Sequence, residues 1–381
     1  MQISCPLTQP QVDLVTVFQV LSFIALGTFI IGMLIAPKLI KLLKKLNVLQ
    51  PGKDELERII KKVRLTRGRP IMGGLIIMIT MFIYTGLTFL FKTNTPKEAW
   101  ILPVLIAGTI LGFINDVADL KGKLQRLRIH DRYNPLIHSK FDRWLIWHYI
   151  STPFRLFKRF TRFFGSYTSG LSASSRLFWE FIITSFGALL INQIHPINNI
   201  WLGHFGYLEV PVWLASAIYG VIGVAFINAF NITDGVDAIS ASNHIISFTG
   251  TLILAVALKE YTFARFLAAF IGVETAFLFF NIPPAKIEMS DTGTVPIGLF
   301  YFLSFVYLNR VLLSPFFGIW YIIIVASSTL QVAWVLLFKK RLFPIAPFHH
   351  LLEKKGIERP SIVMYSNLVT LLGVLIGLLV A

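Results

Sequence analysis

The side chains best suited to chemistry lie in one ten-residue stretch, where two amides and two carboxylates follow each other at three-residue intervals. They are Asn228, Asn231, Asp234 and Asp237. At helical spacing, positions i, i+3, i+6 and i+9 drift slowly around one face, so the four are expected to line one wall of a cleft. Such a wall suits a hard cation with its phosphates, or the edge of a base and a ribose. The alternative is a polar turn between membrane helices, but a turn does not require this spacing.

Two further carboxylates, Asp116 and Asp291, help to predict which metal ion such a cleft would bind. The chain has a single cysteine, Cys5, which excludes a disulfide framework and any cysteine-based metal site. Oxygen-dominated ligation suits Mg²⁺ or Mn²⁺. For any one Asp alone, a helix cap or a partner for a loop arginine is the simpler interpretation. Together with a basic surface, the set indicates phosphoryl-group chemistry on an anionic substrate.

The elements that carry these residues are expected to be membrane helices. The chain has 381 residues, is 55% apolar, has a mean hydropathy of +0.70 and only 14% charged residues, whereas a soluble protein carries about a quarter. Apolar runs of spanning length lie near residues 15–37, 71–91, 99–115, 177–195, 212–230, 238–258, 262–281, 295–313, 316–338 and 361–380. No basic region precedes the first run, so no cleavable signal peptide is expected. The sequence therefore predicts an all-α polytopic membrane protein with about ten transmembrane helices.

The basic residues predict how these helices are oriented. Segments 38–70, 116–176 and 339–360 hold 11, 12 and 6 Lys and Arg residues, which together are 29 of the 35 in the chain. All three lie on one side if the spans alternate, and the positive-inside rule makes that side cytoplasmic. Loop 196–211, on the other side, has no Lys or Arg and is expected to form a short hairpin or loop. Both termini are then external.

This topology brings five polar or glycine-rich segments to the cytoplasmic face: residues 68–74, 112–116, 228–237, 281–293 and 346–350. Chance would scatter such segments over both faces, so we infer one cytoplasmic active site at the lipid boundary. His349 and His350 add groups that hydrogen-bond a phosphate or ligate a metal, although two interfacial histidines without a function remain the alternative. Gly73 and Gly74 are equally explained by close helix packing.

The stretch at about 121–170 is a basic, aromatic insert in what is otherwise expected to be a single integral membrane domain, residues 1–381. Phe154, Phe157 and Phe160 recur at near-helical spacing with cations between them. That pattern favours an amphipathic helix on an anionic bilayer surface. Nucleic-acid binding is the alternative explanation of a basic, aromatic stretch. Because the insert lies between two membrane spans, we expect membrane lipid as its partner and no nucleic acid.

These segments together resemble the polyprenyl-phosphate N-acetylhexosamine-1-phosphate transferases, and the likeness extends in order over nearly the whole chain. Asn-x-x-Asn-x-Thr-Asp-Gly-x-Asp is matched at 228–237, and Phe-Asn-x-x-Pro-Ala-x-x-x-Met-x-Asp-x-Gly at 280–293. Ala-Pro-x-His-His followed by Glu is matched at 346–353, Pro-x-Met-Gly-Gly at 70–74, and Gly-Leu-Ser at 170–172. Met72 and Thr233 resemble the muramoyl-pentapeptide branch more than its N-acetylglucosamine-phosphate relatives.

The resemblance implies a role for each site residue. Asp291 would be the principal Mg²⁺ ligand and a catalytic residue, and Asn115-Asp116 would be the acidic pair that handles the lipid phosphate. The uridine nucleotide would be held by Asn231, Asp234, Gly235, Asp237 and Asn281. His349 would act on the sugar-phosphate side. Further substrate contacts would come from Asn228, His350, Arg67 and Arg176.

The chain also departs from the family pattern. Asn115 replaces one carboxylate of the acidic pair with an amide that cannot accept a proton as a base. Other departures are Thr66 and Asp119 in place of lysines, Ile71 in place of threonine, Glu288 in place of a base-stacking aromatic, and Leu351 in place of a third histidine. The lost cations have candidate replacements in Arg64, Arg67, Arg69 and Lys121.

The resemblance implies Mg²⁺-dependent transfer of phospho-MurNAc-pentapeptide from UDP-MurNAc-pentapeptide to undecaprenyl phosphate, which yields lipid I and UMP in a bacterial inner membrane. A sister enzyme that uses UDP-GlcNAc or another UDP-sugar is the nearest rival. A transporter is disfavoured because its polar residues would lie near the midplane. A non-catalytic lipid-binding scaffold stays open because of the departures, and a homodimer is one option for the oligomeric state.

Overall fold

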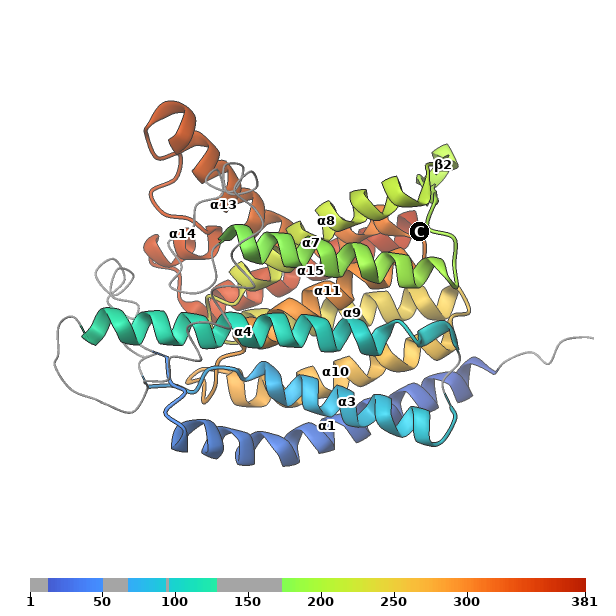
Figure 1. Cartoon of the computed structure of the whole chain (residues 1–381), viewed down its shortest axis with the longest axis horizontal. Helices are drawn as coiled ribbons and strands as arrows, with labels where there is room; N and C mark the ends of the chain where they lie inside the picture. The colour runs from blue at the N-terminus through green and yellow to red at the C-terminus, as the bar shows by residue number, and fades with distance from the viewer. Residues whose placement is uncertain (1–12, 51–67, 94–95, 129–172) are drawn as a thin grey trace, which may run out of the picture.

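The computed structural model describes residues 13–50, 68–93, 96–128 and 173–381, and the described part of the chain is almost entirely helical (Figure 1). The helices before the hairpin are α1 (Leu14–Lys45), α3 (Gly74–Leu90), α4 (Ile101–Arg128) and α7 (Ala173–Asn192). The later ones are α8 (Val212–Thr233), α9 (Ile239–Ala257), α10 (Tyr261–Asn281), α11 (Asp291–Tyr307), α12 (Ser314–Phe317), α13 (Ile319–Phe338), α14 (Phe348–Lys354) and α15 (Arg359–Val380). Most of the basic insert, residues 129–172, lies outside the described part.

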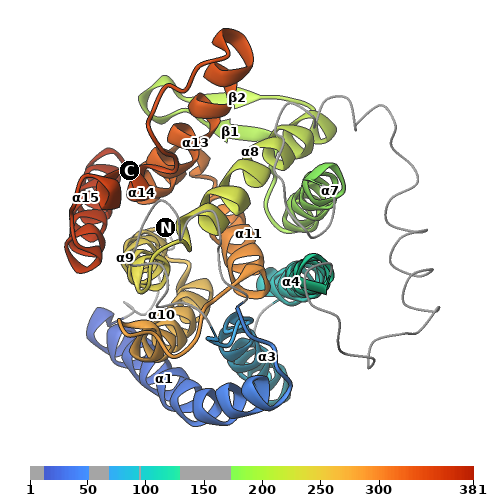
Figure 2. The ribbon, with the colours of Figure 1, turned by 90° about the vertical axis from the view of Figure 1, so that its left-hand side faces the viewer.

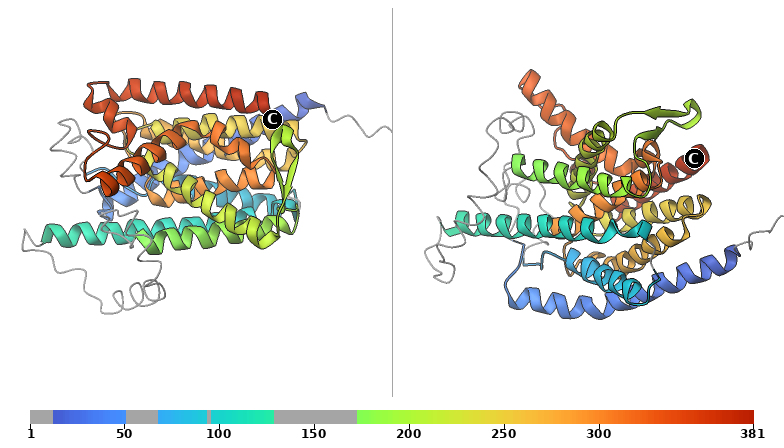
Figure 3. Two further views of the ribbon diagram at one scale, coloured as in Figure 1. Left: turned by 90° about the horizontal axis from the view of Figure 1, so that it is seen from above. Right: turned by 45° about the vertical axis from the view of Figure 1, so that its right-hand side comes forward.

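The predicted all-α, multi-pass membrane fold is confirmed. Eight of the described helices are long and apolar enough to cross a membrane: α1, α4, α7, α8, α9, α10, α13 and α15. Each of the ten predicted runs overlaps one described helix of 17 residues or more. However, α3 and α11 have only 17 residues each, about 25 Å of helix against a hydrocarbon core of about 30 Å. The count of ten spans therefore stays a prediction. The long helices run roughly alongside one another (Figure 3).

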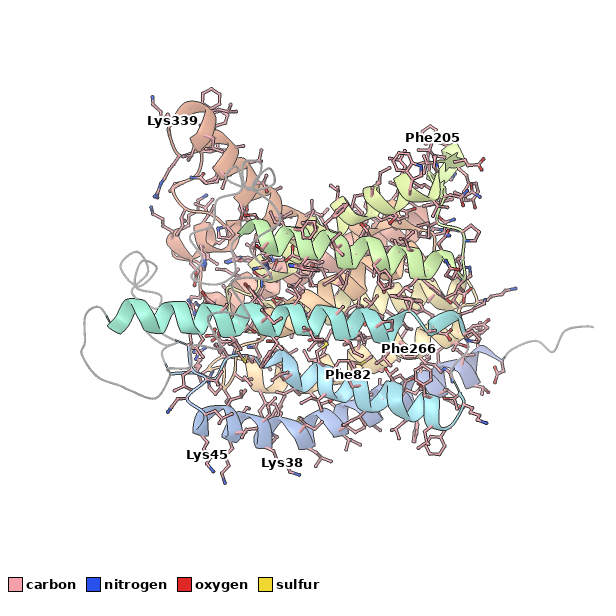
Figure 4. The ribbon with its side chains drawn as sticks, viewed as in Figure 1. Lys38, Lys45, Phe82, Phe205, Phe266 and Lys339 are labelled. Atoms are coloured by element: carbon pink, nitrogen blue, oxygen red, sulfur yellow. The ribbon has the colours of Figure 1, made fainter. Side chains whose placement is uncertain are left out.

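Lysines from two distant parts of the chain lie at one end of the molecule. Lys44 and Lys45 close α1, and Lys339 follows α13. Figure 4 places Lys45 and Lys339 toward the same end of the molecule, opposite Phe205. The first turn of α1 and the C-terminus lie at the Phe205 end (Figure 1). Which end faces the cytoplasm stays a prediction.

The predicted hairpin at 196–211 is present at the end of the molecule marked by Phe205 (Figure 4). Strands β1 (Asn199–Trp201) and β2 (Tyr207–Glu209) pair antiparallel. Its turn contains Gly203 and Gly206, both with positive φ, a backbone conformation that glycine adopts without a steric penalty.

Helix α11 lies at the centre of the bundle, surrounded by α3, α4, α7 and α8 (Figure 2). Every residue from Thr292 to Tyr307 is buried. A helix that is apolar on all sides belongs in the interior, and rings from neighbouring helices stack on it, such as Phe270 on Phe300 at 4.4 Å between centroids. The only carboxylate on this helix is Asp291, its first residue. The fold thus places one carboxylate where the central helix reaches the end of the bundle.

Candidate active site

The carboxylate of Asp291 is the point on which four helices converge. Its Oδ1 accepts a hydrogen bond from Nδ2 of Asn231, and its Oδ2 accepts from Nδ2 of Asn115 and, at 3.3 Å, from Nη1 of Arg176. The Asn231 amide also donates to Oγ1 of Thr294 at 2.9 Å. The donors come from α4, α7 and α8. The structure therefore brings together residues that the sequence placed up to 176 positions apart.

Asp116 holds the first turn of α11 in place through hydrogen bonds. Its Oδ1 accepts from the backbone N–H of Asp291 at 3.2 Å, and its Oδ2 from the N–H of Thr292 at 2.9 Å and from the Thr292 hydroxyl. The first N–H groups of a helix have no partner within the helix, and a carboxylate there also interacts favourably with the helix dipole. Asp116 is thus an N-terminal cap supplied by a neighbouring helix. Asn115 and Asp116 both act on the orientation of Asp291.

Two glycines allow the close approach of α3 and α4 to this first turn. A Cβ added to Gly112 would lie 2.2 Å from the carbonyl oxygen of Asp291, and one added to Gly74 would lie 2.1 Å from Cα of Gly293. Gly112 lies one turn before Asn115 on the same face of α4. Gly74, for which the sequence offered close helix packing as an explanation, and Gly112 both serve packing here.

The wall predicted at 228–237 is only partly helical. Helix α8 ends at Thr233, so Asn228 and Asn231 share a helix, whereas Asp234 and Asp237 lie in the connection to α9. The expectation of one continuous face is therefore wrong for the two carboxylates. The helix stops where the polar side chains find partners on different elements: the Oδ2 of Asp234, for example, accepts from the N–H of Ser290 at 3.1 Å.

Asn281 stabilises the connection between α8 and α9 through two hydrogen bonds. Its Oδ1 accepts from the N–H of Ala238 at 2.8 Å, and its Nδ2 donates to the carbonyl of Ile287 at 2.8 Å. Ala238 has a φ of +69°, and its N–H is satisfied only because the amide is there. With 3% of its surface exposed and both ends of its amide engaged, Asn281 positions the residues predicted to bind the nucleotide.

Asp237 is paired with Arg69, one of the four cations proposed to replace the missing lysines. Nη1 of Arg69 lies 2.8 Å from both carboxylate oxygens, and each side chain is 10% exposed. The backbone around Arg69 is held by Gln50 and by residues 288–289: the N–H of Gln50 donates to the Arg69 carbonyl at 2.7 Å, and the N–H of Glu288 donates to the Pro70 carbonyl at 3.0 Å. These hydrogen bonds hold residues 68–70 at the edge of the site.

Arg176 is held by a carboxylate that the sequence reading missed. Its Nε donates to Oε1 of Glu180 at 2.8 Å, while Oε2 of Glu180 accepts from Nδ2 of Asn228 at 2.5 Å. Glu180 is completely buried. The available signal was an acidic residue four positions after a basic one inside an apolar run, which is the spacing of a helical ion pair.

The two histidines lie at the start of α14. His349 is completely buried, and its Nε2 lies against Gly235, where an added Cβ would approach it to 2.5 Å. Nδ1 of His350 lies 2.7 Å from Oε2 of Glu353, whose other oxygen accepts from Arg359. Burial raises the pKa of the Glu353 carboxyl, but the hydrogen bonds from His350 and Arg359 and the charge of the arginine outweigh it and hold the pKa below its ordinary value.

Some predicted residues fall outside what the structure describes. Arg64, Arg67 and Thr66 lie in the segment 51–67, and the side chain of Lys121 is likewise outside the description. The substrate contact predicted for Arg67 therefore stays a prediction. Of the candidate cations, the described part of the chain places Arg69 at the site.

The residues around Asp291 fit a hard divalent cation. Among the residues the structure describes, no three His, Cys, Asp or Glu side chains lie close enough to hold a metal ion by themselves. The side chains of Asn115 and Asn231 also carry amide oxygens, a ligand type that suits hard cations, and their Nδ2 atoms are the ones that donate to Asp291. Mg²⁺ is commonly held by one or two carboxylates, with waters and substrate phosphates as the other ligands. One carboxylate between two amides is such a partial set.

Comparison with known proteins finds relatives over nearly the whole chain. Residues 167–309 match the model of glycosyl transferase family 4. Over 355 residues the chain is 28% identical to a phospho-N-acetylmuramoyl-pentapeptide-transferase of Wolbachia sp. subsp. Drosophila simulans, with 88% of this chain and 91% of the relative covered. It is 27% identical to proteins of the same name from Staphylococcus aureus and Caldicellulosiruptor bescii, with 93% and 92% of this chain covered and 97% and 94% of the relatives.

The fold is that of a multi-pass membrane protein, and the relatives that it resembles carry the name of a phosphotransferase. The chain is similar over nearly its whole length to proteins named phospho-N-acetylmuramoyl-pentapeptide-transferase, and its residues 167–309 match glycosyl transferase family 4. The resemblance drawn from the sequence motifs is confirmed.

Proposed function

We propose that the protein transfers phospho-MurNAc-pentapeptide from UDP-MurNAc-pentapeptide to undecaprenyl phosphate, with release of UMP and formation of lipid I. The reaction would take place with Mg²⁺ at the cytoplasmic face of a bacterial inner membrane. The observation that carries the proposal is the convergence of Asn115, Arg176 and Asn231 on Asp291 at the end of the central helix. A carboxylate held by three donors from three helices is preorganised, and preorganised charge is the main source of catalysis in phosphoryl transfer.

In this proposal Asp291 would be the protein's ligand to Mg²⁺, held in position by the amides of Asn115 and Asn231, and substrate phosphates and waters would supply the other ligands. The ion, when bound, neutralises charge on the pyrophosphate of the donor. Arg176 supplies a fixed positive charge on the same side, since its Nη1 is already 3.3 Å from Asp291. Asp116 keeps the start of α11, and so the Asp291 carboxylate, in place.

The nucleotide would lie along the connection between α8 and α9. Asp234 and Asp237 suit the ribose and the base edge, because carboxylates accept hydrogen bonds from hydroxyl and N–H groups. Asp237 is oriented for this by Arg69. Gly235 lets the buried His349 ring approach the backbone, which places an imidazole beside the expected sugar-phosphate position, with His350 next to it.

The chemical step proposed is direct attack by a phosphate oxygen of undecaprenyl phosphate on the β-phosphorus of the donor. The new P–O bond forms as the bond between this phosphorus and the bridging oxygen breaks, and UMP leaves with that electron pair. A phosphate monoester has a second pKa of about 6 and is largely a dianion at neutral pH, so no protein base is needed. That is how an amide at Asn115 is compatible with turnover.

The rival donors make the decisive test. UMP release is measured from the purified protein in detergent with undecaprenyl phosphate and Mg²⁺, with UDP-MurNAc-pentapeptide and UDP-GlcNAc supplied separately and EDTA as the control. The proposal expects release with the pentapeptide donor alone, abolished by EDTA. Release with UDP-GlcNAc instead would move the chain to the sister branch. No release with either donor would contradict the proposal and favour a non-catalytic lipid-binding scaffold.

A further inference from the structure

The ion pair between Arg176 and Glu180 lies in the first two turns of α7, and neither residue is at the surface. The carboxylate of Glu180 is completely buried, and the side chain of Arg176 is 14% exposed. Both oxygens of Glu180 are used, Oε1 by Nε of Arg176 at 2.8 Å and Oε2 by Nδ2 of Asn228 at 2.5 Å. The carboxylate therefore links α7 to α8 and fixes the guanidinium by its inner edge.

The outer edge of the same guanidinium faces the site. Nη1 lies 3.3 Å from Oδ2 of Asp291. Nη2 is buried and has no hydrogen-bond acceptor among the residues that the structure describes. A guanidinium is a rigid planar fork with five N–H groups, so fixing its Nε edge also fixes the direction of the other two nitrogens. An unsatisfied, charged donor beside Asp291 is ready to receive an anionic oxygen.

Stability alone does not account for this pair. Removing two charges from water costs more than their attraction commonly returns, and buried ion pairs are often replaceable by apolar residues of similar volume without loss of stability. A purely stabilising Arg176 would also have its donors satisfied within the fold. Here Nη1 reaches Asp291, and Nη2 is left for a group that the described residues do not supply.

We propose that Glu180 is a positioning residue for the donor pyrophosphate. It holds Arg176 through Nε so that Nη1 and Nη2 are presented to Asp291 and to a phosphate oxygen of the bound nucleotide. This inference rests on the proposed function and adds to it a residue that acts through Arg176 and does not touch the substrate itself.

The test compares the binding of UDP and UMP to the purified protein by calorimetry, with EDTA present so that metal binding does not contribute. Both ligands share the base, the ribose and one phosphate, and only UDP carries the second phosphate. We expect wild type to bind UDP more tightly than UMP, and Glu180→Gln to reduce the UDP/UMP affinity ratio by about tenfold. Glu180→Asp, which keeps the charge, should retain more of the ratio than Glu180→Gln.

Ser185→Ala is the matched control, because Ser185 lies on the same helix and its buried hydroxyl has no hydrogen-bond partner in the described part of the chain. The control should leave the ratio unchanged. A merely structural role for Glu180 would weaken UDP and UMP equally, and an unchanged ratio in Glu180→Gln would overturn the inference while leaving the proposed function intact. Failure of wild type to bind either nucleotide would overturn the inference, whereas the donor assay with Mg²⁺ decides the proposed function independently.

A second variant covers the case in which Glu180→Gln does not fold. The double change Arg176→Met/Glu180→Met removes both charges together, so that no unpaired charge remains in the bundle. It should fold and lose the preference for UDP over UMP. A double variant that folds and keeps the wild-type ratio would overturn the inference.

Discussion

Gly112 provides the sharpest test of how α4 meets the start of α11. An alanine at this position would bring its Cβ to 2.2 Å from the Asp291 carbonyl oxygen, 2.7 Å from the Asp291 carbonyl carbon and 2.9 Å from Cα of Thr292. All three are backbone atoms, so no side chain can rotate away. The clash can be relieved only if one helix moves.

The size of that movement follows from the contact distance. Ordinary van der Waals contact begins at 3.4 Å, so the helices must separate by roughly 1 Å, and a misplacement of that size at a reacting centre costs about 100-fold in turnover. Asn115 lies one turn further along the same face and moves with the helix. Its hydrogen bond to Asp291 would be stretched or lost, as would the cap that Asp116 provides. Overpacking adds a loss of about 1 to 3 kcal/mol in the free energy of unfolding.

The assay is the rate of UMP release together with the unfolding temperature in detergent. Gly86→Ala is the matched control, since Gly86 is a helical glycine on α3 with no neighbouring atom within 4 Å of an added Cβ. It should keep full turnover and gain up to about 1 kcal/mol from the better helix propensity of alanine. If Gly112→Ala kept both the turnover and the unfolding temperature of wild type, the contact between α4 and α11 described here would be refuted.

Three further predictions follow from local geometry. Ser290 has a φ of +62° and makes no side-chain cap hydrogen bond, so Ser290→Gly should stabilise the protein by about 1 kcal/mol in thermal unfolding, and Ser290→Ala should not. Arg69→Gln leaves the Asp237 carboxylate without its cation and should lower the free energy of unfolding by about 3 kcal/mol. In a double-mutant cycle, the variant that also carries Asp237→Asn should regain most of that loss. The lowered pKa of Glu353 means that the folded state favours its carboxylate. The resulting stability is present above the ordinary pKa of about 4.3 and is lost as pH falls through the lowered value, so Glu353→Gln should weaken the loss of stability on acidification in unfolding scans.

The membrane fold could be predicted from the sequence because length and hydropathy decide it locally. Each predicted apolar run overlaps a helix, and the loop without Lys or Arg contains the hairpin. The convergence of the polar segments was predictable as well, because spans that alternate bring their ends to one face. The boundary of α11 was less accurate: it begins at Asp291, four residues before the predicted start, because Asp116 caps it from another helix.

The partners within the site could not be predicted from spacing. No local sequence pattern predicts that Asp237 pairs with Arg69 or that Asn228 pairs with Glu180, because both contacts join segments far apart in the chain. The helical spacing of 228–237 suggested one wall, but α8 ends at Thr233 because its polar residues reach different elements. Glu180 was not predicted as a site residue because it lies inside the run 177–195, which hydropathy assigns to a membrane span.

The central claim is that the Asp291 carboxylate, held by α4, α7 and α8, is the centre of a phosphosugar transfer. The most direct test is formation of the lipid-linked product from labelled UDP-MurNAc-pentapeptide and undecaprenyl phosphate, with wild type and Asp291→Asn purified in parallel and matched in unfolding temperature. Asparagine keeps the shape and removes the charge. We predict product with wild type and Mg²⁺, and a loss of at least about 100-fold in Asp291→Asn. Equal product from the two proteins would contradict the claim.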